Sequence, residues 1–219
     1  MLKNREVPKE LKEFNSLFFG FEYRHDLNRV FDDLLTVIIC AMGRGTQEPL
    51  YLETIKKYNR KELDTLCRLF GELTKIYSVH TSSGDWCDPL GEYYECLTGN
   101  YKKSNFGQFF TPKSICNMMA SFVIDNDFGK TINEPCSGSG RMVLAANHIT
   151  KGNYYVCQDL DPICCKMTAI NLCFHEIRAE IHCHNSLMMD KPRFSLATNY
   201  EFWKNKTYTI LYYNNDKNG

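Results

Sequence analysis

The second half of the chain alternates between short apolar stretches and longer amphipathic ones, and this alternation constrains the fold more than any other feature. Strands are predicted at 131–133, 154–158, 179–184 and 208–213. Helical stretches separate most of them. Strands that alternate with helices build a mostly parallel sheet with helices on both faces. The expected fold class is therefore α/β.

Three helices are predicted in this half from their start signals and apolar faces. Thr111 followed by Pro112 is a helix cap with proline at the first helical position. The buried face of that helix is expected to consist of Ile115, Met118, Met119 and Phe122. A second helix is predicted over 141–149, and a third begins after Asp161-Pro162.

The first hundred residues have helical periodicity instead. Apolar residues recur at spacings of three and four over 27–39 and again over 63–77. Such stripes favour a core between helices, with a partner-binding face as the alternative. Gly43-Arg44-Gly45 breaks the chain between the two stripes. A long helix is therefore predicted on each side of this break.

The chain is predicted to have two parts. A polar and basic stretch at 98–105 is typical of a linker or an exposed loop. We therefore expect a helical N-terminal region over 1–105 and an α/β domain over 106–219.

Charge and hydropathy exclude several broad classes. The 26 basic and 26 acidic residues cancel, so bulk charge does not indicate nucleic acid, and a DNA partner would need a local basic patch or another subunit. The charged start at 1–13 does not match a cleavable signal peptide. The longest apolar stretch, 34–42, is shorter than the roughly 20 residues that cross a bilayer. A cytoplasmic protein without a membrane span is expected.

The eleven cysteines are most simply reduced thiols, as is usual in a cytoplasm. Structural zinc is the alternative. However, no CxxC pair occurs, and alternation along a strand would place Cys183 on the face opposite to His182 and His184. No metal site is predicted.

The most informative segment is Glu134-Pro135-Cys136-Ser137-Gly138-Ser139-Gly140, which joins a predicted strand to a predicted helix. A doubly wound sheet places its ligand crevice at such a junction. Glycine lets the backbone turn tightly beside a ligand, and the following helix offers unpaired N–H groups to a carboxylate. The next strand ends in Asp159, at about the spacing of an acid that binds ribose hydroxyls. The pair indicates an adenosine-containing cofactor, with a plain tight turn and a helix-flanking acid as the alternative.

Three ordered motifs carry a resemblance to a known family. They are Asp88-Pro89-Leu90-Gly91-Glu92-Tyr93-Tyr94-Glu95, Gly107-Gln108-Phe109-Phe110-Thr111-Pro112 and the glycine-rich segment, followed by Gln158-Asp159, Asn171-Leu172 and His175-Glu176-Ile177. Over about 85–187 the chain resembles the modification (M) subunit of type I restriction–modification systems and related adenine-N6 DNA methyltransferases. The resemblance implies S-adenosylmethionine (SAM) as cofactor and a Rossmann-like methyltransferase fold, truncated here to about four parallel strands.

The resemblance also implies a cofactor site. Residues 110–112 would border the methionine end of SAM. Glu134 and the turn at 138–140 would hold its amino acid part, Asp159 would bind the ribose, and Asn185 would lie near the adenine ring. The implied site consists of Phe110, Thr111, Pro112, Glu134, Pro135, Cys136, Ser137, Gly138, Ser139, Gly140, Asp159, Leu160, Asn185 and Ser186.

The chain departs from the family after its fourth predicted strand. There the family carries an Asn or Asp, two prolines and an aromatic residue, which hold the flipped adenine against the methyl group. Here the strand runs into Asn214-Asn215-Asp216-Lys217-Asn218-Gly219. Asn214 or Asn215 is the remaining candidate for the catalytic position. The last three strands of the family's seven-stranded sheet are also missing, and an open edge is expected at the fourth strand.

These observations favour a SAM-binding protein of the adenine-N6 DNA methyltransferase family that does not transfer methyl groups by itself. One alternative is an active methyltransferase whose target-base loop comes from a partner chain. The other is a helical interaction module whose Rossmann-like half is only a scaffold. DNA would be reached through other subunits, with a specificity-type subunit or a second copy of the chain as the expected protein partner.

Overall fold

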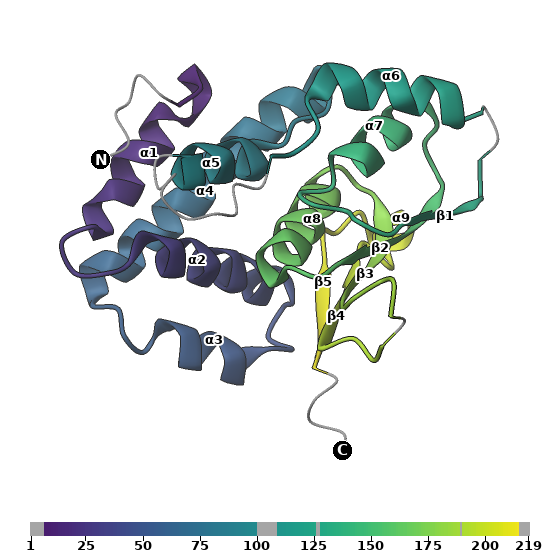
Figure 1. Cartoon of the computed structure of the whole chain (residues 1–219). Helices are drawn as coiled ribbons and strands as arrows, with labels where there is room; N and C mark the ends of the chain where they lie inside the picture. The colour runs from purple at the N-terminus through teal and green to yellow at the C-terminus, as the bar shows by residue number, and fades with distance from the viewer. Residues whose placement is uncertain (1–6, 100–108, 126–127, 189, 215–219) are drawn as a thin grey trace.

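A computed structural model of the chain describes residues 7–99, 109–125, 128–188 and 190–214 (Figure 1). Its first part is helical. The helices there are η1 (Lys9–Leu11), α1 (Lys12–Phe18), η2 (Phe19–Phe21), α2 (Leu27–Met42), α3 (Glu48–Ile55), α4 (Arg60–Ser82) and α5 (Pro89–Gly99). The two predicted apolar stripes lie on α2 and α4 and are largely buried, which confirms that they belong to the core.

Side-chain caps fix where α2 and α4 begin. Asp26 precedes α2, and its carboxylate accepts the backbone N–H of Arg29 at 3.0 Å. Asn59 and Glu62 form a reciprocal capping box at the start of α4, with distances of 3.1 and 2.8 Å. These contacts satisfy N–H groups that a first helical turn leaves unpaired. Both helix starts are therefore encoded locally in the sequence.

A five-stranded sheet and further helices form the second part of the described chain. The strands are β1 (Thr131–Glu134), β2 (Tyr154–Asp159), β3 (Arg178–Cys183), β4 (Phe194–Thr198) and β5 (Ile210–Asn214), and they pair in that order. The helices are α6 (Lys113–Val123), α7 (Arg141–Ile149), α8 (Pro162–Phe174) and α9 (Phe202–Asn205). The predicted α/β class is confirmed.

The sequence does not predict β4, and this strand changes the sheet. The four predicted strands, β1, β2, β3 and β5, run in one direction, whereas β4 lies between β3 and β5 and is antiparallel to both. In the link from β3 to β4, the described residues 184–188 and 190–193 form no helix. A parallel crossover needs a dozen or more residues and usually a helix, so this short link turns the chain back. The expectation of about four parallel strands is confirmed only in part.

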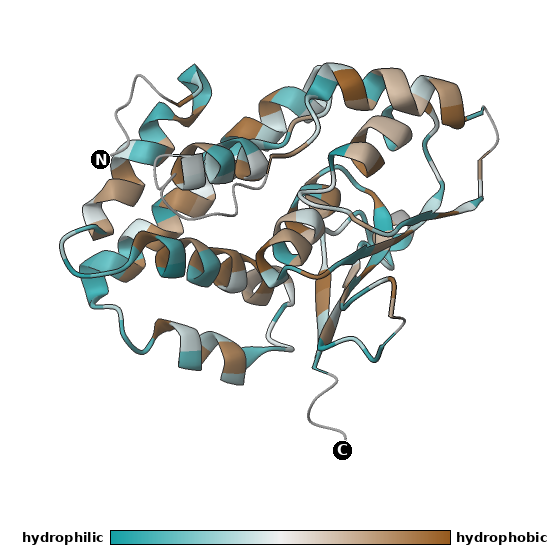
Figure 2. Ribbon diagram, in the orientation of Figure 1, coloured by the Kyte–Doolittle hydropathy of each residue, from teal (hydrophilic) through white to brown (hydrophobic). Residues whose placement is uncertain are grey.

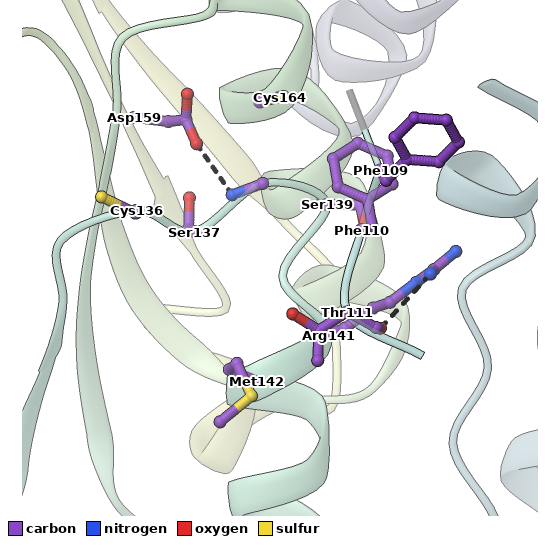
Figure 3. Close-up of a pocket in the computed structure, with 11 residues that line it drawn as sticks. Phe109, Phe110, Thr111, Cys136, Ser137, Ser139, Arg141, Met142, Asp159 and Cys164 are labelled. Atoms are coloured by element: carbon purple, nitrogen blue, oxygen red, sulfur yellow. Dashed lines mark hydrogen bonds between the residues drawn. The ribbon is translucent and has the colours of Figure 1, made fainter. Parts of the chain in front are cut away.

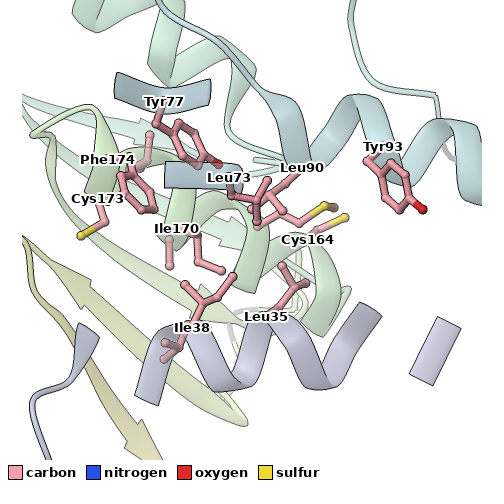
Figure 4. Packing of buried hydrophobic residues seen from close by; sticks show 14 of the residues in the cluster. Leu35, Ile38, Leu73, Tyr77, Leu90, Tyr93, Cys164, Ile170, Cys173 and Phe174 are labelled. Carbon is pink, nitrogen blue, oxygen red and sulfur yellow. The ribbon is translucent and has the colours of Figure 1, made fainter. Parts of the chain in front are cut away.

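Helix α8 is the centre of the hydrophobic core. Its side chains are buried from Met167 to Phe174, and they pack against α2 and α4 as well as the sheet (Figure 4). The rings of Tyr77 on α4 and Phe174 stack with centroids 4.2 Å apart. One buried cluster therefore runs from the N-terminal helices into the sheet.

Helix α6 departs from its predicted burial. Its expected core face of Ile115, Met118, Met119 and Phe122 is exposed, and Phe122 reaches 80% exposure. The helix instead buries the small side chains of Cys116 and Ala120 as it packs against α7. The prediction fails because the apolar spacing marks a face suited to burial without specifying what covers it.

Strand β5 is an edge of the described sheet, and its backbone is partly covered. The amide Nε2 of Gln47, just before α3, donates to the carbonyl oxygen of Tyr212 at 2.9 Å. Helix α2 also contacts this strand. The N-terminal helices thus protect part of the edge that was expected to be open.

Candidate functional site

The glycine-rich segment forms a tight turn between β1 and α7. Gly138 and Gly140 have φ angles of 56° and 92°, in the left-handed region that glycine adopts without strain. A Cβ atom at Gly138 would lie 3.0 Å from Cδ1 of Phe110. Glycine at this position therefore permits both the turn and the close approach of the Phe110 ring.

The carboxylate of Asp159, at the end of β2, is hydrogen-bonded to this turn. Its Oδ2 accepts the backbone N–H of Gly138 at 2.8 Å, and its Oδ1 accepts that of Asp161 at 2.9 Å. Burial raises the pKa of Asp159 above its ordinary value, although these N–H groups oppose the shift. The acid and the glycine turn, which were paired from their spacing in the sequence, are brought together by the fold.

A cavity of about 240 Å³ lies between this turn and the segment that precedes α6 (Figure 3). Predicted site residues that line it are Phe110, Thr111, Cys136, Ser137, Gly138, Ser139 and Asp159. Lining residues that the sequence does not predict are Phe109, Arg141, Met142 and Cys164. The cavity combines a carboxylate and hydroxyl groups with aromatic and sulfur-bearing side chains.

Other predicted residues do not line this cavity. The side chain of Glu134 forms a hydrogen bond within the glycine-rich segment, where its Oε1 accepts the backbone N–H of Cys136 at 3.2 Å. Burial raises the pKa of Glu134. Asn185 lies on the loop after β3, and its Oδ1 accepts the N–H of Leu187 at 3.0 Å. The remaining residues outside the lining are Pro112, Pro135, Gly140, Leu160 and Ser186.

Asn214, the catalytic candidate, is the last residue of β5. It lies at the same end of the parallel strands as Asp159, the carboxyl end. The register runs from Asp159 through Cys183 and Phe194 to Asn214. Three strand spacings separate the two ends of this row, about 14 Å at the usual distance between strands. Gly107, Gln108 and residues 215–219, which belong to other sequence predictions, lie outside the described part of the chain.

The fourth strand of the structure is β4, and it is followed by Asn199-Tyr200-Glu201-Phe202. An asparagine and an aromatic residue thus stand in the first and last places of the expected four-residue pattern, but tyrosine and glutamate replace the two prolines. Since β4 is antiparallel to β3, Asn199 lies near the amino end of β3, at the end of the strands opposite to Asp159. Its buried amide donates to the carbonyl oxygens of Cys173 and Ile177 at 2.9 and 3.2 Å. Asn199 therefore stabilises the end of α8 and does not face the cavity.

A buried carboxylate supports the glycine turn from behind. Asp88, only 2% exposed, accepts hydrogen bonds from the Gly91 N–H, the Ser139 hydroxyl, the Arg141 Nε and the Asn171 amide at 2.6–2.8 Å. All four partners are donors, which is the arrangement that an ionised carboxylate needs. The turn is thereby fixed to α5 and α8.

Arg141 joins the turn to the opposite wall of the cavity. Its Nη2 donates to Oε2 of Glu95 at 2.9 Å, while Oε1 of the same carboxylate accepts the N–H of Phe110 at 2.8 Å. The guanidinium also lies 5.3 Å from the centroid of the Phe110 ring. Burial alone would lower the pKa of Arg141, but the Asp88 and Glu95 carboxylates raise it overall. The ion pair of Arg141 and Glu95 therefore connects the glycine turn on one wall of the cavity to Phe110 on the other.

Residues 7–99, 109–125, 128–188 and 190–214 contain neither a membrane-spanning helix nor a metal-binding cluster. No helix there is long and apolar enough to cross a bilayer. No group of three or more His, Cys, Asp or Glu side chains there has the arrangement of a metal site.

Comparison with known proteins identifies the family of this chain. The profile of the N-6 DNA methylase family matches residues 86–218. Among solved structures, the fold is similar to a crystal structure of the type I restriction–modification system methyltransferase subunit from Streptococcus thermophilus, with a TM-score of 0.46 and 19% sequence identity. The similarity covers 84% of this chain and 46% of that subunit, so the chain spans less than half of its length. The family match covers more than half of the chain, includes β1 to β5 and the glycine turn, and shows that the chain belongs to the N-6 DNA methylase family.

Proposed function

We propose that this chain binds SAM in the cavity beside the glycine turn. The observation that carries the proposal is the hydrogen bond from the Gly138 N–H to the Asp159 carboxylate, because it unites the turn and the acid at one wall of the cavity. An acid at the end of the second strand is the usual partner of ribose hydroxyls in such sheets.

The groups that line the cavity fit the parts of SAM. The Asp159 carboxylate would accept the ribose hydroxyls, and Ser137 offers a hydroxyl beside it. The first turn of α7 supplies backbone N–H groups suited to the carboxylate of the methionine part. Phe109 and Phe110 provide aromatic surface, and Met142 adds an apolar side chain. SAM would supply the electrophilic methyl group, and these residues would bind and orient it.

We further propose that the chain serves in DNA adenine-N6 methylation as a cofactor-binding part, with the acceptor half supplied elsewhere. In this proposal residues 1–105 form a helical region that supports the SAM-binding domain over 106–219. Contact with DNA is made through other subunits, such as a specificity-type subunit, and the protein works in the cytoplasm. Asn199 lies at the end of the strands opposite to Asp159, which supports the proposal that the adenine-binding groups come from elsewhere.

Isothermal titration of SAM into the purified chain tests the proposal. We expect one site per chain, with ATP as a control ligand that shares the adenosine part but lacks the methionine part. Saturable binding of SAM and much weaker binding of ATP would support the assignment. An absence of SAM binding by folded protein would contradict it and favour a scaffold role.

Substitution of Gly138 by valine is expected to abolish SAM binding while the fold survives. A β-branched side chain is strained at a φ of 56°, and its Cβ would press on the Phe110 ring, so the wall of the cavity must shift. The matched control is Gly84→Val, because Gly84 has a φ of 76° and open space around its Cβ position. Calorimetry on both variants should show wild-type affinity only in Gly84→Val. Wild-type affinity in Gly138→Val would mean that the turn does not contact SAM.

A further inference from the structure

Two polar side chains lie on the otherwise apolar second half of α8. Figure 2 shows this helix mostly in the brown of apolar residues, and residues 167–174 are all buried. Thr168 and Asn171 are the polar residues of that stretch, and their spacing of three places them on one face of the helix. A buried polar group costs free energy unless it is hydrogen-bonded. The Thr168 hydroxyl donates to the carbonyl oxygen of Gly138 at 2.9 Å, so this face of α8 holds the glycine-rich turn.

Asn171 holds a second peptide unit of the turn. One N–H of its amide donates to the carbonyl oxygen of Ser139 at 2.8 Å. The same peptide unit carries the Gly140 N–H, which donates to the carbonyl oxygen of Ser137 at 2.7 Å. Because a peptide unit is planar, a contact that fixes its carbonyl group also fixes its N–H. Asn171 thereby stabilises the hydrogen bond that closes the turn.

Tyr77 of α4 completes the hydrogen bonding of the Asn171 amide. The other amide N–H donates to Oδ1 of Asp88 at 2.7 Å, and the amide oxygen accepts the Tyr77 hydroxyl at 2.5 Å. Both donors and the oxygen of the amide are therefore engaged. In the opposite amide orientation, the oxygen would face two acceptors, the Asp88 carboxylate and the Ser139 carbonyl. The three contacts therefore select one orientation of Asn171.

The Tyr77 hydroxyl is itself held in place. Its ring stacks on Phe174 with 4.2 Å between the centroids and 8° between the planes, and it meets the His175 ring edge-on at 5.8 Å (Figure 4). Tyr77 is 1% exposed, and burial raises its pKa well above the ordinary value, so the hydroxyl stays protonated. Without this hydroxyl, the Asn171 oxygen would be a buried acceptor that lacks its donor. A side chain in that state gains by shifting, which would loosen its contact with Ser139.

We propose that Tyr77 is a positioning residue for the glycine-rich turn and that it acts through the Asn171 amide. Helix α4 then reaches the turn through two consecutive hydrogen bonds, from Tyr77 to Asn171 and from Asn171 to Ser139. Ser139 lines the cavity, whereas Tyr77 does not. The N-terminal helices thus hold the shape of a wall to which they contribute no contact with SAM. The effect on cofactor affinity rests on the SAM site proposed above, but the effect on the turn does not.

Tyr77→Phe tests the proposal, because it removes the hydroxyl and keeps the stacked ring. We expect the dissociation constant of SAM, measured by calorimetry, to rise about fivefold or more. Hydrogen exchange of the Gly140 amide, followed by NMR in SAM-free protein, should become faster as the turn loosens. The matched control is Tyr93→Phe, because the buried Tyr93 hydroxyl also donates to an asparagine oxygen, that of Asn15 at 2.9 Å. Neither Tyr93 nor Asn15 lines the cavity, so the control should leave both measurements unchanged.

A double-mutant cycle with Asn171→Ala shows whether Tyr77 acts through this amide. In the Asn171→Ala background, Tyr77→Phe should have little further effect on the dissociation constant of SAM, whereas independent contributions would add. Circular dichroism checks that each variant is folded. If Asn171→Ala does not fold, the two measurements on Tyr77→Phe decide the question.

Weaker SAM binding and faster Gly140 exchange in Tyr77→Phe, with Tyr93→Phe like the wild type, would support the proposal. Wild-type values of both quantities in Tyr77→Phe, or equal changes in the two variants, would overturn it. A wild type that binds no SAM would count against the proposed function alone, because Gly140 exchange in the SAM-free protein still decides whether Tyr77 positions the turn.

Discussion

Replacement of Asp88 by alanine is expected to lower the free energy of unfolding by about 3–5 kcal/mol, the usual cost of removing one partner from a buried ion pair. The carboxylate accepts four hydrogen bonds, including one from the guanidinium of Arg141. In the variant, Arg141 keeps Glu95 as a partner, but the Ser139 hydroxyl and the Asn171 amide lose an acceptor in the interior. Buried donors without acceptors carry the desolvation cost that folding would otherwise offset.

Urea denaturation of the two proteins measures this loss. Asp64→Ala is the control, because Asp64 forms an exposed i,i+4 pair with Arg60 on α4. Exposed pairs of this kind are worth about 0.3–0.5 kcal/mol. A loss of less than about 1 kcal/mol in Asp88→Ala would show that the network is not the support of the glycine turn.

The second large effect is an absence of activity: the chain alone should transfer no methyl group to DNA. Adenine must leave the duplex stack at a cost of a few kcal/mol and be held by stacking and polar contacts. The Asn199 amide donates to the carbonyl oxygen of Cys173 at the end of the strands opposite to Asp159. Asn214 lies about 14 Å across the sheet from Asp159. A net charge of zero also supplies little attraction for phosphates.

Incubation with tritiated SAM and mixed-sequence DNA tests this expectation, with an active adenine-N6 methyltransferase as the positive control. Asn199→Ala should reduce stability, since it removes the hydrogen bonds to the end of α8. It should leave the background level of label unchanged. Label at adenine N6 that disappears in Asp159→Ala would instead identify an active enzyme, completed by a second copy or by a pocket outside the described residues.

The parts of the site that the sequence predicts are those encoded by local pattern. The turn at 138–140 needs glycine for its backbone angles, and Asp159 ends the next strand, so spacing alone pairs them. The start of α4 follows from the capping box of Asn59 and Glu62. Each of these features depends on residues close in sequence or on one strand–turn–helix unit.

The parts that the sequence does not predict depend on tertiary contacts. Arg141 meets Asp88 and Glu95 across 53 and 46 residues, and no local pattern encodes those pairings. Strand β4 is a short buried run without clear alternation, which periodicity cannot separate from a loop or a helix segment. The apolar face of α6 is recognisable in the sequence, but the structure alone reveals that the described chain leaves it exposed.

The central claim, that SAM binds beside the glycine turn, is tested most directly by calorimetric titration of SAM into Asp159→Ala and Asp161→Ala beside the wild type. Asp161 is the matched control, because its carboxylate caps α8 two residues away and accepts the Ile163 N–H at 2.8 Å. We predict that Asp159→Ala weakens binding about 10- to 100-fold, the effect of losing a hydrogen bond to a charged group, while Asp161→Ala binds like the wild type. Equal affinity in the wild type and Asp159→Ala would contradict the account.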